Sequence, residues 1–507
     1  MTDPGRDPAR PTAAGTDLGR PTSVSVFAAR VHAFDRDRRP IVAGFLFAVT
    51  LAIAMAAKLD ATLPVLGWLV ATAALFAPSA GLTVIATLAM LREPAGLGPI
   101  GFNGTVIAAS GLGMLGRLVL DGLVGRRIAI RPEFAAIGAF LVLSTFQFLR
   151  LAARTTDERE RFALTQLIAV CSGLILVIVI GTVFSSTSRR WVVTAMVPGI
   201  ILAAFAAMAS LSPAVLGALP IGGLLPTEDI SVRGTGIFRN PNYLGLAMAL
   251  GFVLVGRSRS LELPTGMVRR PWLLAGPVAI AVIVSFSRGA LLALVGGIVA
   301  LYASRGRRAL ALASIVGLLA VAIGYPVLLN VRHALTFGPN VELGDEAQAA
   351  SDASRVAVLE AGIKLLARQP IMGIGVGQFH YESVTYVAGS PVTYPHNTYL
   401  QIAVEQGLLG ISAFMLVLVT LFYSLSRARG DPYRVTARSM LVIFSVGALF
   451  AEPLTSMQGN AILWIAIGAA LAGAEPSGHP DSFDVARGRF DHESTGQHRP
   501  VFGRRAR

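Results

Sequence analysis

Apolar runs of roughly 16 to 23 residues recur along almost the whole chain, and they alternate with short polar segments that carry arginine. Each run is near the length that a helix needs to cross the ~30 Å hydrocarbon core of a bilayer. The pattern predicts an all-α polytopic membrane protein with about 12 to 14 transmembrane helices, because three runs are short enough to be half-helices. The predicted spans are 41–58, 61–78, 80–92, 103–120, 133–152, 163–184, 191–211, 241–256, 273–286, 288–304, 308–330, 397–425, 436–453 and 458–473.

Composition favours the same fold class. The 507 residues are 54% hydrophobic and only 14% charged, whereas soluble proteins have about 25% charged residues. The net charge of +14 comes mostly from arginines between the apolar runs, which indicates membrane topology rather than nucleic-acid binding. Cys171 is the only cysteine, so an intrachain disulfide and a site built from several thiolates are excluded.

The arginines also predict an orientation. When Arg36, Arg38 and Arg39 are placed in the cytoplasm and each span changes sides, nearly all later arginine clusters fall in the cytoplasm too. These clusters are Arg126, Arg127 and Arg131; Arg189 and Arg190; Arg257, Arg259, Arg269 and Arg270; Arg305, Arg307 and Arg308; and Arg427, Arg429, Arg434 and Arg438. Residues 153–162 are the exception, because this segment is placed outside the cytoplasm and yet carries three arginines. Three acidic residues in the same segment reduce the weight of this exception.

This topology predicts one large extracytoplasmic loop. The polar segments discussed below fall mostly on the same extracytoplasmic face of the membrane. The expected parts are a disordered cytoplasmic N-terminus (1–40), transmembrane helices (41–330), the large loop (331–395), further transmembrane helices (396–474) and a disordered cytoplasmic tail (475–507). Within the loop, apolar residues at helical spacing predict a helix at about 352–368. "GIGVGQ" at 373–378 lacks the strand–turn–helix context of a nucleotide loop, so it is interpreted as a turn.

The junction "SFSRGA" at 285–290 places Arg288 between two apolar runs. An arginine near membrane depth is costly unless it is paired or hydrated. It is either an interfacial arginine that contacts lipid headgroups or an anion receptor, whose planar fork suits phosphate. Under the second interpretation, Ser285 and Ser287 add hydrogen-bond donors and Gly289 lets a ligand approach the backbone.

A second candidate segment is "RGTGIFRNPNYLG" at 233–245, with Arg233 and Arg239 six residues apart. Asn240-Pro241-Asn242 predicts a turn that opens a helix near Pro241. A helix N-terminus with two arginines suits a phosphate or pyrophosphate, and the alternative is a basic loop that only caps its helix.

The third segment is "HNTYLQIAVEQGLLG" at 396–410. His396 precedes a helix and can accept a proton near neutral pH, or it is structural. Asn397 is a predicted N-cap, and Gly407 and Gly410 are expected to let helices pack closely. Glu405, about 12 Å further along the helix, is expected to pair with a buried arginine or to line a polar pocket. The sequence contains no HExxH motif, Cys/His cluster or paired-aspartate motif for a metal, so neither metal nor cofactor is expected.

These segments, in this order, resemble the O-antigen ligase and O-antigen polymerase superfamily. The resemblance rests on His396, Asn397, Gly407 and Gly410, on "SFSRGA" and "RGTGIFRNPN", and on "ARQPIMGIGVGQF" upstream of His396. It covers residues 230–415 by motif and the remainder only by hydropathy. It implies a GT-C-like, metal-independent, inverting glycosyltransferase of the cytoplasmic (inner) membrane that acts on the extracytoplasmic face.

The resemblance also implies substrates and roles. The donor is a glycan on polyprenyl pyrophosphate, and the acceptor is a sugar hydroxyl on a glycan or glycolipid, with membrane lipid and other polysaccharide-assembly proteins as further partners. Arg233 and Arg288 are expected to bind pyrophosphate with Arg239 and Ser287, and His396 is the expected base. Asn242, Asn397, Glu405, Gly407 and Gly410 are expected to support the site.

Three alternatives remain open at this point. A flippase for lipid-linked oligosaccharides needs polar residues through both halves of the membrane, whereas the clusters here fall on one face. A structural scaffold of the cell envelope would tolerate alanine at Arg233 and Arg288. A related enzyme that attaches glycans to protein shares the same motifs, as do ligase and polymerase.

Overall fold

The computed structural model describes residues 70–72, 74–75, 77–88, 101–123, 131–152, 157–184, 186–210, 238, 240–263, 270–303, 305–319, 322, 345–387, 394–428 and 430–472. This part of the chain consists of helices and turns and contains no strand, which confirms the all-α fold. The helices are α4 (Pro78–Leu88), α5 (Gly101–Leu123), α6 (Pro132–Ala152), α7 (Asp157–Val183), η2 (Ser186–Ser188), α8 (Arg189–Ala209), α10 (Pro241–Gly256), α12 (Pro271–Val284), α13 (Arg288–Ala303), α15 (Asp345–Arg368), α16 (Phe379–Ser383), α17 (Thr398–Arg427), α18 (Pro432–Gly447), η4 (Pro453–Thr455) and α19 (Met457–Leu471).

The predicted spans and the observed helices correspond from span 80–92 onward. Span 41–58 and most of span 61–78 lie outside the described residues, and span 308–330 is represented by a helix at 307–319. Within the described ranges, four helical segments are long and apolar enough to cross a membrane: Pro132–Ala152, Glu158–Val183, Arg189–Ala209 and Thr398–Arg427. Shorter apolar helices accompany them, including α10, α12 and α13. The chain is therefore an all-α polytopic membrane protein, while the total of about 12 to 14 spans stays a prediction.

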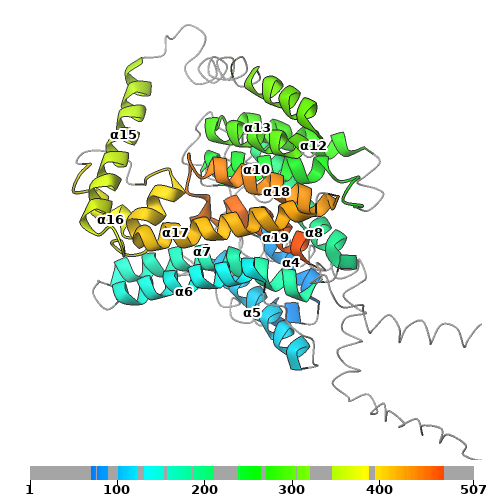
Figure 1. Cartoon of the computed structure of the whole chain (residues 1–507), viewed down its shortest axis with the longest axis horizontal. Coiled ribbons are helices and arrows are strands. Elements are labelled where there is room, and N and C mark those ends of the chain that lie inside the picture. The colour runs from blue at the N-terminus through cyan, green and yellow to red at the C-terminus, as the bar shows by residue number, and fades with distance from the viewer. Residues whose placement is uncertain are drawn as a thin grey trace, which may run out of the picture.

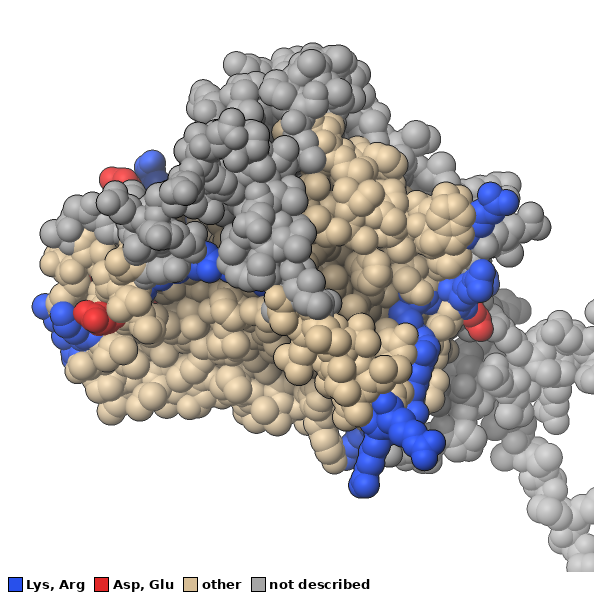
Figure 2. Space-filling model, turned by 90° about the horizontal axis from the view of Figure 1, so that it is seen from above, with Lys and Arg blue, Asp and Glu red and all other residues tan. Residues whose placement is uncertain are grey.

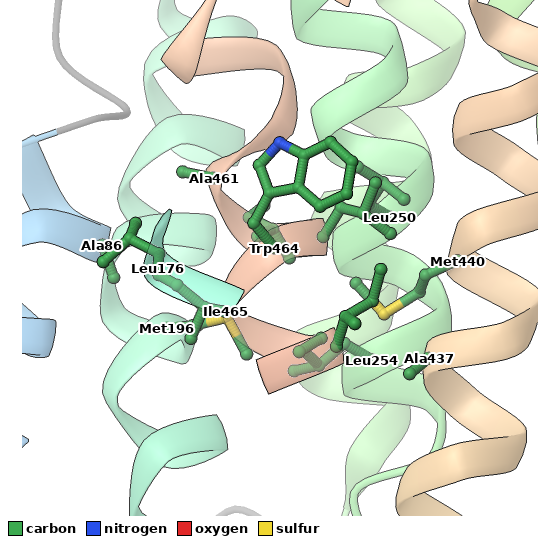
Figure 3. Close-up of a cluster of buried hydrophobic side chains, with 14 of the residues drawn as sticks. Ala86, Leu176, Met196, Leu250, Leu254, Ala437, Met440, Ala461, Trp464 and Ile465 are labelled. Carbon is green, nitrogen blue, oxygen red and sulfur yellow. The ribbon is translucent and has the colours of Figure 1, made fainter. Parts of the chain in front are cut away.

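Apolar packing around α19 forms the centre of the described helices (Figure 3). Trp464 is fully buried, and its ring meets Phe444 of α18 edge-on with 5.3 Å between centroids. The indole ring packs directly against α7 at Gly173, and only glycine leaves room for it, because a Cβ there would lie 2.4 Å from Trp464 Cδ1. Small residues at such contacts let helix backbones approach closely, which is how helices associate in lipid.

The helices form a layered bundle in which α6, α7, α17 and α18 run side by side (Figure 1). Helices α10 and α13 pack on α18, on the side away from α17 (Figure 1). Helices α15 and α16 lie beyond one end of α6 and α7 (Figure 1). Figure 2 shows an uncharged surface across the middle of one face, with most Lys and Arg side chains toward its two ends. This distribution fits a belt of lipid contact between two polar ends.

One polar end brings together arginines that the sequence placed on a common side. Arg189 forms an ion pair with Asp431 at 2.6 Å. Arg434 donates to the carbonyl of Ser424 at 3.1 Å, and Arg131 donates to the carbonyl of Leu471 at 2.6 Å. These residues stand at the starts of α8, α18 and α6 and near the ends of α17 and α19, so these helix termini share one end of the bundle.

The opposite end carries the described part of the predicted loop. The helix expected at about 352–368 is present as α15, and "GIGVGQ" forms a turn between α15 and α16, as predicted. Arg159 belongs to segment 153–162, which the predicted topology placed outside the cytoplasm despite its arginines. It forms an ion pair with Glu382 of α16 at 3.1 Å. The start of α7 and the loop therefore lie at the same end, where Glu382 offsets the charge of Arg159.

Candidate functional site

The start of α10 packs against the junction between α12 and α13. Asn240 caps α10 by accepting the N–H of Asn242 at 2.8 Å, with Pro241 in the first turn, as predicted. A Cβ at Gly245 would lie 2.6 Å from Ser285 Oγ and 2.7 Å from Ala290 Cβ, so only glycine allows this close approach. Two segments that the sequence singled out separately are thereby brought into contact.

The junction itself is a tight turn that starts α13 at Arg288. Phe286 has φ +48°, and Ser287 caps the helix by accepting the N–H of Ala290 at 3.3 Å. Ser285 and Ser287 are buried, and Arg288 is half-buried. The sequence expected Gly289 to admit a ligand, but this position admits Phe450, whose Cβ would lie 2.6 Å from an added Cβ.

Phe450 belongs to a turn at 448–452 that holds the start of α17. The N–H of Thr398 donates to the carbonyls of Ala448 at 2.8 Å and Ala451 at 3.2 Å, and its hydroxyl donates to Ala451 at 3.1 Å. Asn397 caps α17 by accepting the N–H of Leu400 at 3.0 Å, as predicted. The 448–452 turn thus contacts both α13 and α17 at their N-termini.

His396 lies beside Glu452 of this turn. The backbone N–H of His396 donates to Glu452 Oε1, and Nδ1 of its ring is 3.6 Å from Oε2. His396 has φ +46°, a conformation that costs a non-glycine residue of order 1–3 kcal/mol. The Glu452 side chain is 3% exposed and that of His396 is 28% exposed, so the carboxylate is inside and the imidazole reaches the surface. Tyr243 of α10 also lies beside Glu452.

The N-termini of α10, α13 and α17 therefore converge around Arg288, His396 and Glu452. Each helix N-terminus carries a partial positive charge of about half a unit, and arginine adds a full charge. The cluster thus combines a field suited to an anion with an imidazole that can accept a proton.

A second set of contacts joins the first part of α17 to the turn at 370–377, which follows α15 in the chain. Gly407 has φ +69° and ψ −168°, which interrupts α17, and the turn at 370–377 takes up the released backbone groups. The N–H of Leu408 donates to the carbonyl of Pro370 at 2.8 Å, and the N–H of Gly375 donates to the carbonyl of Glu405 at 2.8 Å. The sequence predicted that Gly407 lets helices pack closely, and it did not predict that this glycine breaks the helix.

Glu405 and Gly410 lie in the same helix, on either side of Gly407. The buried Glu405 Oε1 lies 3.4 Å from both Gln401 Nε2 and the N–H of Phe379, so its described partners are an amide and a backbone group rather than an arginine. An added Cβ at Gly410 would lie 2.2 Å from Gln406 Cβ, so this glycine leaves room for a side chain of its own helix. Glu405 thus joins the first part of α17 to Phe379, whereas Gly410 is required by its own helix rather than by the close approach of a neighbouring helix that the sequence predicted.

The outcome for the predicted site is mixed. Arg288, Ser287, Asn242, His396 and Asn397 come together, whereas Arg233 and Arg239 lie outside the described residues. The sequence interpretation missed Glu452 and Tyr243. A signal existed for Glu452, because it is the only charged residue between Arg438 and Glu475 in a strongly apolar region, and such residues mark function in membrane proteins.

Among the described residues, no group of three or more His, Cys, Asp or Glu side chains is arranged to hold a metal ion. Residues 272–415 match the protein-family model described as O-antigen ligase. The matched segment contains the α12–α13 junction, α15, the glycine turn and His396, and it supports membership in the O-antigen ligase and polymerase superfamily. No curated protein matches the chain.

Proposed function

We propose that this member of the O-antigen ligase and polymerase superfamily transfers a glycan from polyprenyl pyrophosphate to a sugar hydroxyl on the extracytoplasmic face of the cytoplasmic membrane. Glycan transfer of the O-antigen ligase type follows from the family, and the donor, face and mechanism are part of the proposal. The observation that carries it is the position of the 448–452 turn. Its Phe450 packs on Gly289, next to Arg288 at the start of α13, and its Glu452 lies beside His396.

The donor pyrophosphate binds at the convergence of the helix N-termini. Arg288 presents a guanidinium fork there, and the proposal adds Arg233 and Arg239 from the segment before α10. Negative charge on the pyrophosphate grows as the glycosidic bond breaks. Fixed positive groups stabilise that charge more in the transition state than in the ground state, so they accelerate transfer without a divalent metal.

His396 acts as the base for the acceptor. The acceptor oxygen attacks the anomeric carbon, the bond from that carbon to the pyrophosphate oxygen breaks, and the hydroxyl proton passes to His396. Polyprenyl pyrophosphate leaves with the bonding electrons, and a single displacement inverts the anomeric centre. Glu452 faces Nδ1, so Nε2 is the nitrogen that accepts the proton, and the carboxylate stabilises the resulting imidazolium.

The test is reconstitution of the full chain in liposomes with a defined polyprenyl-pyrophosphate oligosaccharide and a glycan acceptor. Formation of the linked product with an inverted anomeric centre, in the presence of EDTA, is the expected result. Loss of transfer on chelation contradicts the metal-independent mechanism. Movement of the donor across the bilayer without acceptor, and without product, indicates a flippase instead.

The same assay separates the two activities of the superfamily. A polymerase lengthens the product step by step when the acceptor is another lipid-linked repeat, whereas a ligase makes a single transfer to a different glycolipid. Product length, resolved by gel electrophoresis, decides between them.

A further inference from the structure

A polar cavity lies among the described residues at the end of the bundle that carries α15 and α16. It has a volume of about 270 Å³ and is lined by Arg150 at the end of α6, Arg159 of α7, Arg368 at the end of α15, and Gln378 and Glu382 of the α16 region. We call these residues the arginine pocket. Three arginines against one carboxylate leave a net charge of +2 (3 − 1) in the cavity, so an anion is the natural occupant.

We propose that the arginine pocket binds an acidic group, a carboxylate or a phosphate, on the acceptor glycan. The inference rests on the proposed function and extends it by naming the class of acceptor. At about 270 Å³ the cavity is many times larger than the ~10–15 Å³ that one water needs, so it has room for an acidic group and part of its sugar ring.

The guanidinium groups are held in place by the protein itself. Arg150 donates to the carbonyl of Gly373 at 2.5 Å, and Arg159 pairs with Glu382 and lies 4.9 Å from the ring centroid of Tyr381. Arg368 lies 5.1 Å from the ring centroid of Tyr386. Such contacts fix the orientation of long side chains in advance, so a ligand loses less entropy on binding.

A buried amide supplies the second observation. Gln378 is 2% exposed and lines the cavity, and within the described part of the chain its Nε2 has no hydrogen-bond partner. A buried donor without an acceptor is unfavourable, and an anionic oxygen in the cavity would satisfy it. Glu382 and Gln378 also provide acceptors for sugar hydroxyls, which favours an acidic sugar over a bare lipid phosphate.

Aromatic contacts connect the pocket to the candidate base. Tyr381, beside Arg159, meets His380 edge-on at 5.2 Å, and His380 stacks on Tyr394 with centroids 5.0 Å apart. Tyr394 precedes His396 by two residues. A glycan whose acidic group occupies the pocket can therefore follow this row of rings toward His396.

The experiment measures binding independently of transfer. The full chain in phosphatidylcholine nanodiscs is titrated with a glucuronate-terminated disaccharide and with its carboxyl-reduced, neutral counterpart. The variants are Arg368→Gln and Gln378→Leu, and the matched control is Arg355→Gln, an exposed arginine of the same helix that does not line the cavity. Inorganic phosphate is the competitor.

The acidic disaccharide is expected to bind roughly tenfold more tightly than the neutral one, with both pocket variants losing most of that difference and Arg355→Gln losing none. Equal affinity for the two disaccharides, or equal losses in Arg368→Gln and Arg355→Gln, overturns the inference. Displacement of the acidic disaccharide by phosphatidylglycerol in the nanodisc, at concentrations where phosphate has no effect, also overturns it, because the pocket then serves a lipid headgroup.

Failure of the proposed function gives a different result. If the wild-type chain forms no linked product but binds the acidic disaccharide as expected, the transferase proposal falls and the pocket stands. If product forms and the acidic group makes no difference to binding, only the pocket inference falls.

Discussion

The carboxylate of Glu452 faces His396, since Oε1 accepts the backbone N–H and Oε2 lies 3.6 Å from Nδ1 of the ring, within ion-pair distance once the imidazole is protonated. The two residues are 56 positions apart, and the carboxylate is almost completely buried. A buried carboxylate next to an imidazole fixes which ring nitrogen faces outward and stabilises the charge that the ring acquires. Glu452 is therefore a positioning residue for the proposed base.

Glu452→Gln keeps an acceptor for the backbone N–H but removes the negative charge. We expect turnover to fall roughly ten- to hundredfold while donor binding is unchanged, since the effect of general bases is typically 10²–10⁴ and the imidazole remains. Steady-state kinetics with separate measurement of donor affinity checks this split. Glu360→Gln, an exposed carboxylate of α15, is the control, and an equal effect of the two variants excludes a role for Glu452.

Replacement of Arg288 tests the donor site. Arg288→Lys keeps a charge but loses the planar fork, so we expect a loss of roughly tenfold in transfer, and Arg288→Ala a loss of roughly hundredfold or more. Arg307→Ala, beyond the opposite end of α13, is the control and is expected to transfer normally. Retention of most activity in Arg288→Ala at normal expression removes Arg288 from the pyrophosphate site.

The fold was largely predictable because its signals are local. A helix that crosses hydrocarbon needs a continuous apolar run, so the positions of α6, α7, α8 and α17 follow from hydropathy. Helix starts at Pro241 and Thr398 were visible in the same way, since Asn caps and first-turn proline act over a few residues.

Parts of the site were not predictable because they depend on contacts between distant segments. No local pattern indicates that the turn at 448–452 folds back onto His396. Residues 397–425 resemble one uninterrupted span, and the break at Gly407 is visible only when the carbonyls of Pro370 and Ile371 accept the N–H groups of Leu408 and Leu409. The apolar residues of α15 show the same limit. Val356 and Ile363 belong to the helical spacing that predicted this helix, yet both side chains are more than half exposed.

Gly407→Ala tests the break in α17. A Cβ at this position would lie 2.2 Å from the carbonyl oxygen of Ile371, and φ of +69° is strained for alanine. We expect a destabilisation of about 1–3 kcal/mol or more from the backbone alone, seen as a lower melting temperature of the purified protein. Gly276→Ala in α12 is the control, because no atom lies within 4 Å of its added Cβ and helical glycine is disfavoured. Equal melting temperatures for the two variants contradict the observed backbone at Gly407.

The stack of His380 on Tyr394 predicts a dependence of stability on pH. Burial lowers the pKa of His380 below its ordinary value of 6.5, so folding favours the neutral imidazole. A lowered folded-state pKa contributes stability that is present above the unfolded value and is lost as pH falls through the folded value. We therefore expect the melting temperature to drop between pH 7.5 and 5 in the wild type, and to drop less in His380→Phe, which keeps an aromatic ring on Tyr394 but cannot be protonated. An unchanged pH dependence in His380→Phe assigns the effect to other groups and shows that protonation of His380 does not weaken this contact.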